Sequence, residues 1–124
     1  MNPFIIQAKD NTTPGVTLDS VKGIFDISGW SHPEDAIAFY APVFEWLNRY
    51  AESPAKEMVF NFRFEYFNTS SSKQIFRLIS LLEEIAKKCK VKVQWHHDAD
   101  DSDMLSAGER FAKMSTLPFE YISH

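Results

Sequence analysis

The stretch MVFNFRFEYFNTSSSKQIFRLISLLEEI, residues 58–85, joins a strand pattern directly to a helix pattern. Its first part alternates apolar residues with Asn61, Arg63 and Glu65, which is typical of a strand with one buried face. Its last part has apolar residues at every third or fourth position, which indicates a helix over residues 70–88. The apolar positions of the strand are Met58, Phe60, Phe62, Phe64 and Tyr66, and those of the helix are Ile75, Leu78, Ile79, Leu82 and Ile85 or Ala86.

The chain after this helix repeats the alternation. In KVKVQWH, residues 90–96, apolar and polar side chains alternate, which predicts a second half-buried strand. The acidic run DADDSD, residues 98–103, leads into a short helix expected at residues 102–114, and Pro118 opens a closing strand. The apolar positions of the second strand are Val91, Val93 and Trp95, and its polar positions are Lys92, Gln94 and His96.

Another helix is expected before residue 58. It is predicted to begin at Ser31, because Glu34 follows at the spacing of a capping box and Pro33 lies in the first turn. Pro54 is expected to end it. The side chains expected to form its buried stripe are Ile37, Tyr40, Phe44 and Leu47.

The N-terminal region adds a predicted strand at residues 4–8, a turn-rich break at residues 10–15 and a hairpin with Gly23 near its tip. The elements then follow the order ββ(β)αβαβαβ. This order predicts an α/β fold: a two-layer α/β sandwich with a mixed sheet and helices mainly on one face, forming a single domain from residues 1–124. The 124 residues are 44% apolar and 15% aromatic, which suits such a core and excludes intrinsic disorder.

The charge and the cysteine content exclude several classes of partner and location. A formal net charge of -4 is a poor match for a phosphate backbone, so no nucleic-acid partner is expected. Cys89 is the only cysteine, so no internal disulfide forms, and a packed thiol is expected. The N-terminal sequence MNPFIIQAKDNTTPG has no basic region and only a short apolar run, so it is neither a signal peptide nor a membrane span. A cytoplasmic protein without membrane insertion is the expectation.

The common motifs of nucleotide and hydrolase chemistry are missing. The chain contains no GxxxxGK[ST], no GxGxxG after a strand and no GxSxG, so P-loop, dinucleotide and nucleophile-elbow sites have no local support. His96, His97 and Asp98 lie together at a strand end, but they lack the ligand spacing of a closed zinc site. No cofactor is expected.

The acidic run resembles a calcium loop only in part. Counted from Asp98, the sixth position is Asp103, where the loop needs Gly for its turn. We interpret the run instead as a solvated turn in which Asp101 or Ser102 caps the next helix. The residues that match loop positions 1, 3, 5 and 12 are Asp98, Asp100, Ser102 and Glu109.

Four consecutive hydroxyl residues lie in YFNTSSSK, residues 66–73, where the aromatic strand stops and a helix opens. Capping by Asn68, Thr69 or Ser70 would use only one of these side chains and leave the rest solvated. A phosphate attached here would meet unpaired N–H groups at the positive end of the helix, with Lys73 within one turn. It would also add roughly -1.5 to -2 of charge, which can switch off a docking surface without unfolding the protein. The segment predicts either a plain helix cap or a phosphorylation site.

Four segments, in one order and spread over nearly the whole chain, resemble the SiaC family of regulatory phosphoproteins. They are GWSHPEDAIAFYAPVFEWLNRY at 29–50, YFNTSSSK at 66–73, VQWHHDADDSDMLSAGE at 93–109 and PFEYI at 118–122. The resemblance implies a fold similar to that of STAS-domain anti-sigma-factor antagonists and a protein with no catalysis of its own.

The resemblance also implies a phospho-switch. In related systems a Ser/Thr protein kinase phosphorylates the threonine that corresponds to Thr69, and a PPM-type phosphatase removes the phosphate. The unphosphorylated form binds and activates a GGDEF diguanylate cyclase, which raises cyclic di-GMP and promotes biofilm growth. The neighbours expected to form the phosphosite loop and partner-binding surface are Asn68, Ser70, Ser71, Ser72 and Lys73.

Two other interpretations of the residues stay open. In the first, the acidic segment from His96 to Asp103 binds a divalent metal or another ligand. In the second, the chain is a scaffold that forms homodimers through its polar sheet face, which carries Arg63, Glu65 and Lys92.

Overall fold

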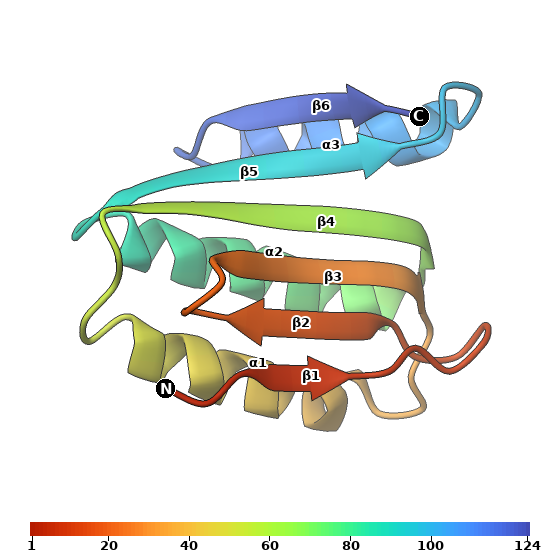
Figure 1. The fold of residues 1–124 in the computed structure, drawn as a ribbon. Coiled ribbons are helices and arrows are strands. Elements are labelled where there is room, and N and C mark those ends of the chain that lie inside the picture. Colours follow the sequence, from red (N-terminus) through yellow and green to blue (C-terminus); the bar gives the residue numbers. More distant parts are fainter.

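The computed structural model describes residues 1–124, which form one six-stranded sheet and three helices (Figure 1). The predicted α/β fold and the order of its elements are confirmed. None of the helices has the length and apolar character needed to cross a lipid bilayer. The elements are β1 (Phe4–Ile6), β2 (Gly15–Asp19), β3 (Ile24–Ser31), α1 (Ala36–Tyr50), β4 (Glu57–Phe67), α2 (Thr69–Ile85), β5 (Lys90–His97), α3 (Ser102–Lys113) and β6 (Phe119–Ser123).

The six strands lie in the sheet in their sequence order. The pairs β1–β2 and β2–β3 are antiparallel, and β3, β4, β5 and β6 pair in parallel, so the sheet is mixed as predicted. Each parallel pair is joined through one helix. Such crossovers are right-handed, and each one here leads to the next strand in the same direction across the sheet. The three helices therefore cover the same face. Figure 1 shows all three on one side of the sheet, which leaves the other face uncovered.

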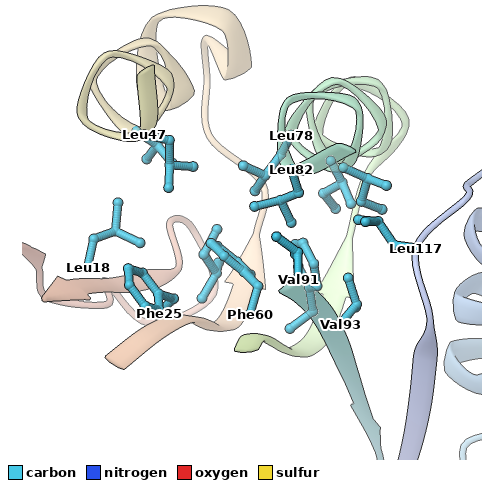
Figure 2. Close-up of a cluster of buried hydrophobic side chains, with 14 of the residues drawn as sticks. Leu18, Phe25, Leu47, Phe60, Leu78, Leu82, Val91, Val93 and Leu117 are labelled. Atoms are coloured by element: carbon cyan, nitrogen blue, oxygen red, sulfur yellow. The ribbon is translucent and has the colours of Figure 1, made fainter. Parts of the chain in front are cut away.

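The core fills the space between the sheet and the helices. Figure 2 shows Leu18 and Phe25 of the sheet opposite Leu47 of α1, and Phe60 and Val91 beneath the leucines of α2. The alternation predicted for residues 58–64 and 91–95 is confirmed, because every apolar side chain of these two runs is buried. The buried members are Met58, Phe60, Phe62, Phe64, Val91, Val93 and Trp95.

The prediction that α1 begins at Ser31 is wrong. Ser31 ends β3, and α1 begins at Ala36 with Asp35 as its N-cap, whose carboxylate accepts a hydrogen bond from Ala38 N at 3.1 Å. The hydroxyl of Ser31 is engaged by partners from α1 and α2 and is not free to cap a helix. The helix then runs through Pro42. Tyr40 and Leu47 of the predicted stripe are buried as expected, whereas Ile37 is 65% exposed and Phe44 is only partly buried. The buried residues of the helix are Ala36, Tyr40, Val43, Trp46, Leu47 and Tyr50.

Tyr66 was expected on the buried face of β4, and this is also wrong. Gly29 pairs with Phe64 but Trp30 pairs with Tyr66, so Glu65 is an extra residue in a β-bulge. The bulge shifts the alternation by one position. Phe67 therefore packs toward the helices, whereas Tyr66 is 39% exposed.

Candidate functional site

The first turn of α2 starts where β4 ends, and Thr69 is the first helical residue. Asn68 caps the helix: its side chain accepts a hydrogen bond from Ser71 N at 2.9 Å, and its carbonyl accepts one from Ser72 N at 2.9 Å. Capping by Asn68 was one of the predicted possibilities. Because Asn68 does the capping, the hydroxyl of Thr69 is not required for it.

A buried chain of hydroxyl groups holds this turn against β3 and α1. Tyr40 contacts Ser31 Oγ at 2.7 Å, Ser31 Oγ donates to Ser71 Oγ at 2.8 Å, and Ser71 Oγ donates to the Ser31 carbonyl at 3.1 Å. The same carbonyl accepts Asn68 N at 3.1 Å. Burial raises the pKa of Tyr40 to about 12, so its hydroxyl keeps its proton and donates. The residues on either side of Thr69 are therefore fixed to the body of the protein.

The serines of the segment divide between surface and interior. Ser71 was expected on a partner-binding surface, but its side chain is fully buried, because it belongs to the hydroxyl chain with Ser31. Ser72 is half-buried. The side chains of Thr69, Ser70 and Lys73 are exposed.

The electrostatics of this turn suit an anion attached at Thr69. The first N–H groups of a helix have no partner within it, and the helix dipole makes this end positive. The first turn of α2 contains no acidic residue, and Lys73 lies one turn along the same face. Negative charge on the Thr69 hydroxyl would be favourably placed and would not strain the fold.

Apolar and aromatic side chains are exposed near this turn. The Tyr66 ring lies 5.0 Å from that of Trp30 and 6.1 Å from that of His32, measured between ring centres. Ile37 is exposed in the first turn of α1, the neighbour of α2, and Phe76 is 41% exposed farther along α2. Sequence reasoning assigned Ile37 and Tyr66 to the core and so missed that both side chains are exposed. We call Ile37, Thr69 and Phe76, which lie on the two neighbouring helices α1 and α2, the switch surface.

A second polar cluster lies on the uncovered sheet face, around His96. This residue was expected on the polar face of its strand, and although it lies on that face only 7% of its surface is exposed. Its Nε2 lies 2.7 Å from Asn61 Oδ1, and its Nδ1 lies 2.8 Å from His124 Nε2 and 3.4 Å from an Arg63 nitrogen. Burial, and then the charges of Arg63 and His124, lower the pKa of His96 to about 4. The imidazole is therefore neutral at pH 7.

The acidic segment does not assemble a metal site. No three His, Cys, Asp or Glu side chains come together as a metal-binding group. Asp101 caps α3 by accepting Met104 N at 3.0 Å, as predicted for Asp101 or Ser102, and His97 Nδ1 lies 2.8 Å from the Asp98 carbonyl. Glu109, at the twelfth position of the partial calcium loop, is in the middle of α3 and not in a loop. The metal-binding interpretation of His96–Asp103 therefore has no ligand set.

Solved structures share the fold over their whole length. The chain is similar to SiaC of Pseudomonas aeruginosa, with a TM-score of 0.89 and 26% identity over 100% of both chains. It is also similar to a chain in the crystal structure of the diguanylate cyclase SiaD in complex with its activator SiaC from the same organism. That match has a TM-score of 0.90 and 26% identity, and covers 98% of this chain and 99% of the other.

A sequence relative gives the same relationship. An uncharacterised protein of Pseudomonas aeruginosa strain UCBPP-PA14 is 27% identical over 114 residues, which is 91% of this chain and 90% of that protein. These likenesses place the chain in a class of small α/β regulatory proteins. The model of the SiaC family of regulatory phosphoproteins matches residues 6–124, and the chain belongs to this family.

Proposed function

We propose that this protein is a phosphorylation-controlled activator of a GGDEF diguanylate cyclase, and that Thr69 is the residue that carries the phosphate. The observation that supports this most directly is the placement of Thr69. Its side chain is exposed at the start of α2, while the backbone N–H of Asn68 and the hydroxyl of Ser71 are both bonded to the Ser31 carbonyl. A SiaC protein of the same fold is described as the activator of the cyclase SiaD.

In the unphosphorylated state, the switch surface binds the cyclase. Apolar anchors that are partly exposed in a free protein contribute most of the affinity when a partner buries them. Ile37 and Phe76 supply such anchors on the two helices beside an uncharged threonine. Their placement on two packed helices gives a rigid surface, so binding loses little conformational entropy.

Phosphorylation stops this binding by changing charge and size. The phosphate brings roughly -1.5 to -2 of charge into a surface that must become desolvated in the complex. The helix N-terminus stabilises the phosphate in the free protein, which stays folded. The cost of desolvating the phosphate therefore weakens only the complex. A differential free energy of about 3 kcal/mol changes the affinity roughly a hundredfold.

The phosphate is added by a Ser/Thr protein kinase and removed by a PPM-type phosphatase. We infer that the protein acts only through binding and performs no catalysis of its own. We place it in the cytoplasm, where a kinase has access to ATP and where the free thiol of Cys89 stays reduced.

The test compares charge at Thr69 with charge at its neighbour. Thr69→Ala, Thr69→Asp and the control Ser70→Asp are titrated against a co-expressed GGDEF diguanylate cyclase candidate, with cyclic di-GMP synthesis as a second readout. Thr69→Ala should bind and activate like the wild type. Thr69→Asp should lose most of the binding and most of the activation. Ser70→Asp, whose side chain points about 100° further round the helix, should lose less of each. Equal binding by Thr69→Ala and Thr69→Asp would show that Thr69 does not gate the complex.

A further inference from the structure

A cavity of about 400 Å³ opens on the uncovered sheet face, beside the β-bulge. It lies where the parallel strands end, which is the usual place for ligands in open α/β sheets. Its volume falls within the range of small-molecule sites. The side chains that give it its chemistry are Trp30, Arg63, Glu65, His97, Asp98 and His124.

The imidazoles in this cavity present hydrogen-bond acceptors. Asn61 Oδ1 can only accept, so the nearby His96 Nε2 carries the proton and His96 Nδ1 is a bare acceptor. His96 Nδ1 therefore accepts from His124 Nε2 and from Arg63. In neutral His124 the proton is then on Nε2, which leaves Nδ1 with a lone pair for a ligand. His97 uses Nδ1 toward the Asp98 carbonyl, so its Nε2 is also a free acceptor.

The charges of the cavity also favour a ligand that donates hydrogen bonds, because they favour a cation. The guanidinium of Arg63 is already paired with Asp26 at 2.5 Å, which neutralises the one fixed cation of the lining. Glu65, Asp98 and Asp101 remain as carboxylates without a salt-bridge partner, and Asp101 uses only one oxygen to cap α3. The lining therefore has excess negative charge and an excess of acceptors, and it repels phosphates and other anions.

We propose that this cavity binds a guanidinium group. A guanidinium supplies five N–H donors in a plane and one positive charge, which matches carboxylates and bare imidazole nitrogens. The half-buried indole of Trp30 offers an aromatic surface on which such a cation is stabilised. A metal ion fits less well, because no three ligating side chains converge.

The test uses Trp30 as the reporter. Of the three tryptophans, Trp46 and Trp95 are buried and their indole N–H groups are bonded to carbonyl oxygens, so Trp30 is the one that a ligand in the cavity can reach. The unphosphorylated full chain is titrated with L-argininamide, with urea as the uncharged analogue, and the indole N–H signals are followed by NMR. A saturable shift confined to Trp30 is expected with argininamide, and none with urea.

A second titration identifies the kind of molecule that carries the guanidinium group. A peptide with a single arginine and blocked ends, acetyl-Gly-Arg-Gly-amide, reproduces a side chain of a partner protein. Binding of this peptide supports an arginine of a protein partner, whereas binding of argininamide alone supports a free small molecule that carries a guanidinium group. If neither compound shifts the Trp30 signal at millimolar concentration, the proposed site is wrong.

Matched variants separate the cavity from general electrostatics. Asp98→Asn removes one carboxylate of the lining, and Asp100→Asn removes one just outside it; both residues are exposed, so folding is preserved in each. Asp98→Asn should weaken binding at least fivefold and Asp100→Asn should leave it nearly unchanged. Equal weakening in both would mean a diffuse charge effect and would overturn the proposal. Neither outcome bears on Thr69, because no phosphate or cyclase is present.

Discussion

The Ser71 hydroxyl donates a hydrogen bond to the main-chain carbonyl of Ser31, forty residues earlier in the chain, at 3.1 Å. This bond ties the first turn of α2 to the end of β3. It fixes the turn that presents Thr69 while leaving the Thr69 side chain in solvent. The rigidity of the switch surface thus comes from a buried serine, and its accessibility comes from the threonine two positions before it.

Removal of this hydroxyl should destabilise the protein. Ser71→Ala leaves Ser31 Oγ without its acceptor in a site that water does not reach, and an unsatisfied buried polar group costs about 1–3 kcal/mol. Urea denaturation measures the loss in the free energy of unfolding. The control is Ser70→Ala, one residue earlier and exposed, which should change stability by less than about 0.5 kcal/mol. Equal stability of the two variants would mean that the hydroxyl chain contributes nothing.

The contact of α3 with β5 should not tolerate an added methyl group. A Cβ atom on Gly108 would lie 2.4 Å from Trp95 Cδ1, and Trp95 is fully buried with its indole N–H bonded to the Met104 carbonyl. Gly108→Ala improves helix propensity, but overpacking of this kind typically costs about 1–3 kcal/mol. Thermal unfolding should therefore show a lower Tm for Gly108→Ala.

The control for this effect is Ser106→Ala, an exposed position of the same helix, which should keep or raise the Tm. A Gly108→Ala protein as stable as the wild type would show that α3 can move away from Trp95 without loss.

Stability should fall at mildly acidic pH because of His96. Its pKa is about 4 in the folded protein and 6.5 in an unfolded chain, so between these values the unfolded chain binds a proton that the folded protein does not. The free energy of unfolding contains the full His96 contribution above pH 6.5 and loses it as the pH falls from 6.5 toward 4. Urea denaturation at a series of pH values in this range should show that the free energy of unfolding changes less steeply with pH in His96→Gln than in the wild type.

The matched control is His97→Gln, which changes the same residue type next to His96 without removing the contacts to Asn61 and His124. His97→Gln should show the same dependence of the free energy of unfolding on pH as the wild type. If His96→Gln and the wild type lose stability in parallel, the buried imidazole is not the group responsible.

Local patterns were sufficient to predict the elements that form the core. Met58, Phe60 and Phe62 follow the period of a strand, and the period itself says which side is buried. The position of Thr69 at the start of a helix could also be predicted, because a run of capping-type residues follows an aromatic strand. These signals are contained within short segments.

The errors have a different origin, since each depends on a partner far away in the sequence. Ser31 and Asp35 are both capping-type residues, and only the contact of Ser31 with Ser71 decides which one caps α1. Tyr66 leaves the core because β3 and β4 pair with a bulge that neither strand shows alone. His96 is buried because Asn61 of the neighbouring strand and the stacked ring of His124 lie against it.

The cyclase-binding switch is tested most directly with the modified protein itself. Protein carrying phosphothreonine at position 69 and protein carrying plain threonine are prepared in parallel and titrated against the cognate diguanylate cyclase by calorimetry, with cyclic di-GMP synthesis measured on the same samples. We predict that the plain form binds and activates the cyclase and that the phosphorylated form binds roughly a hundredfold more weakly, a difference of about 3 kcal/mol. Equal affinity and equal activation by the two forms would contradict the proposed switch.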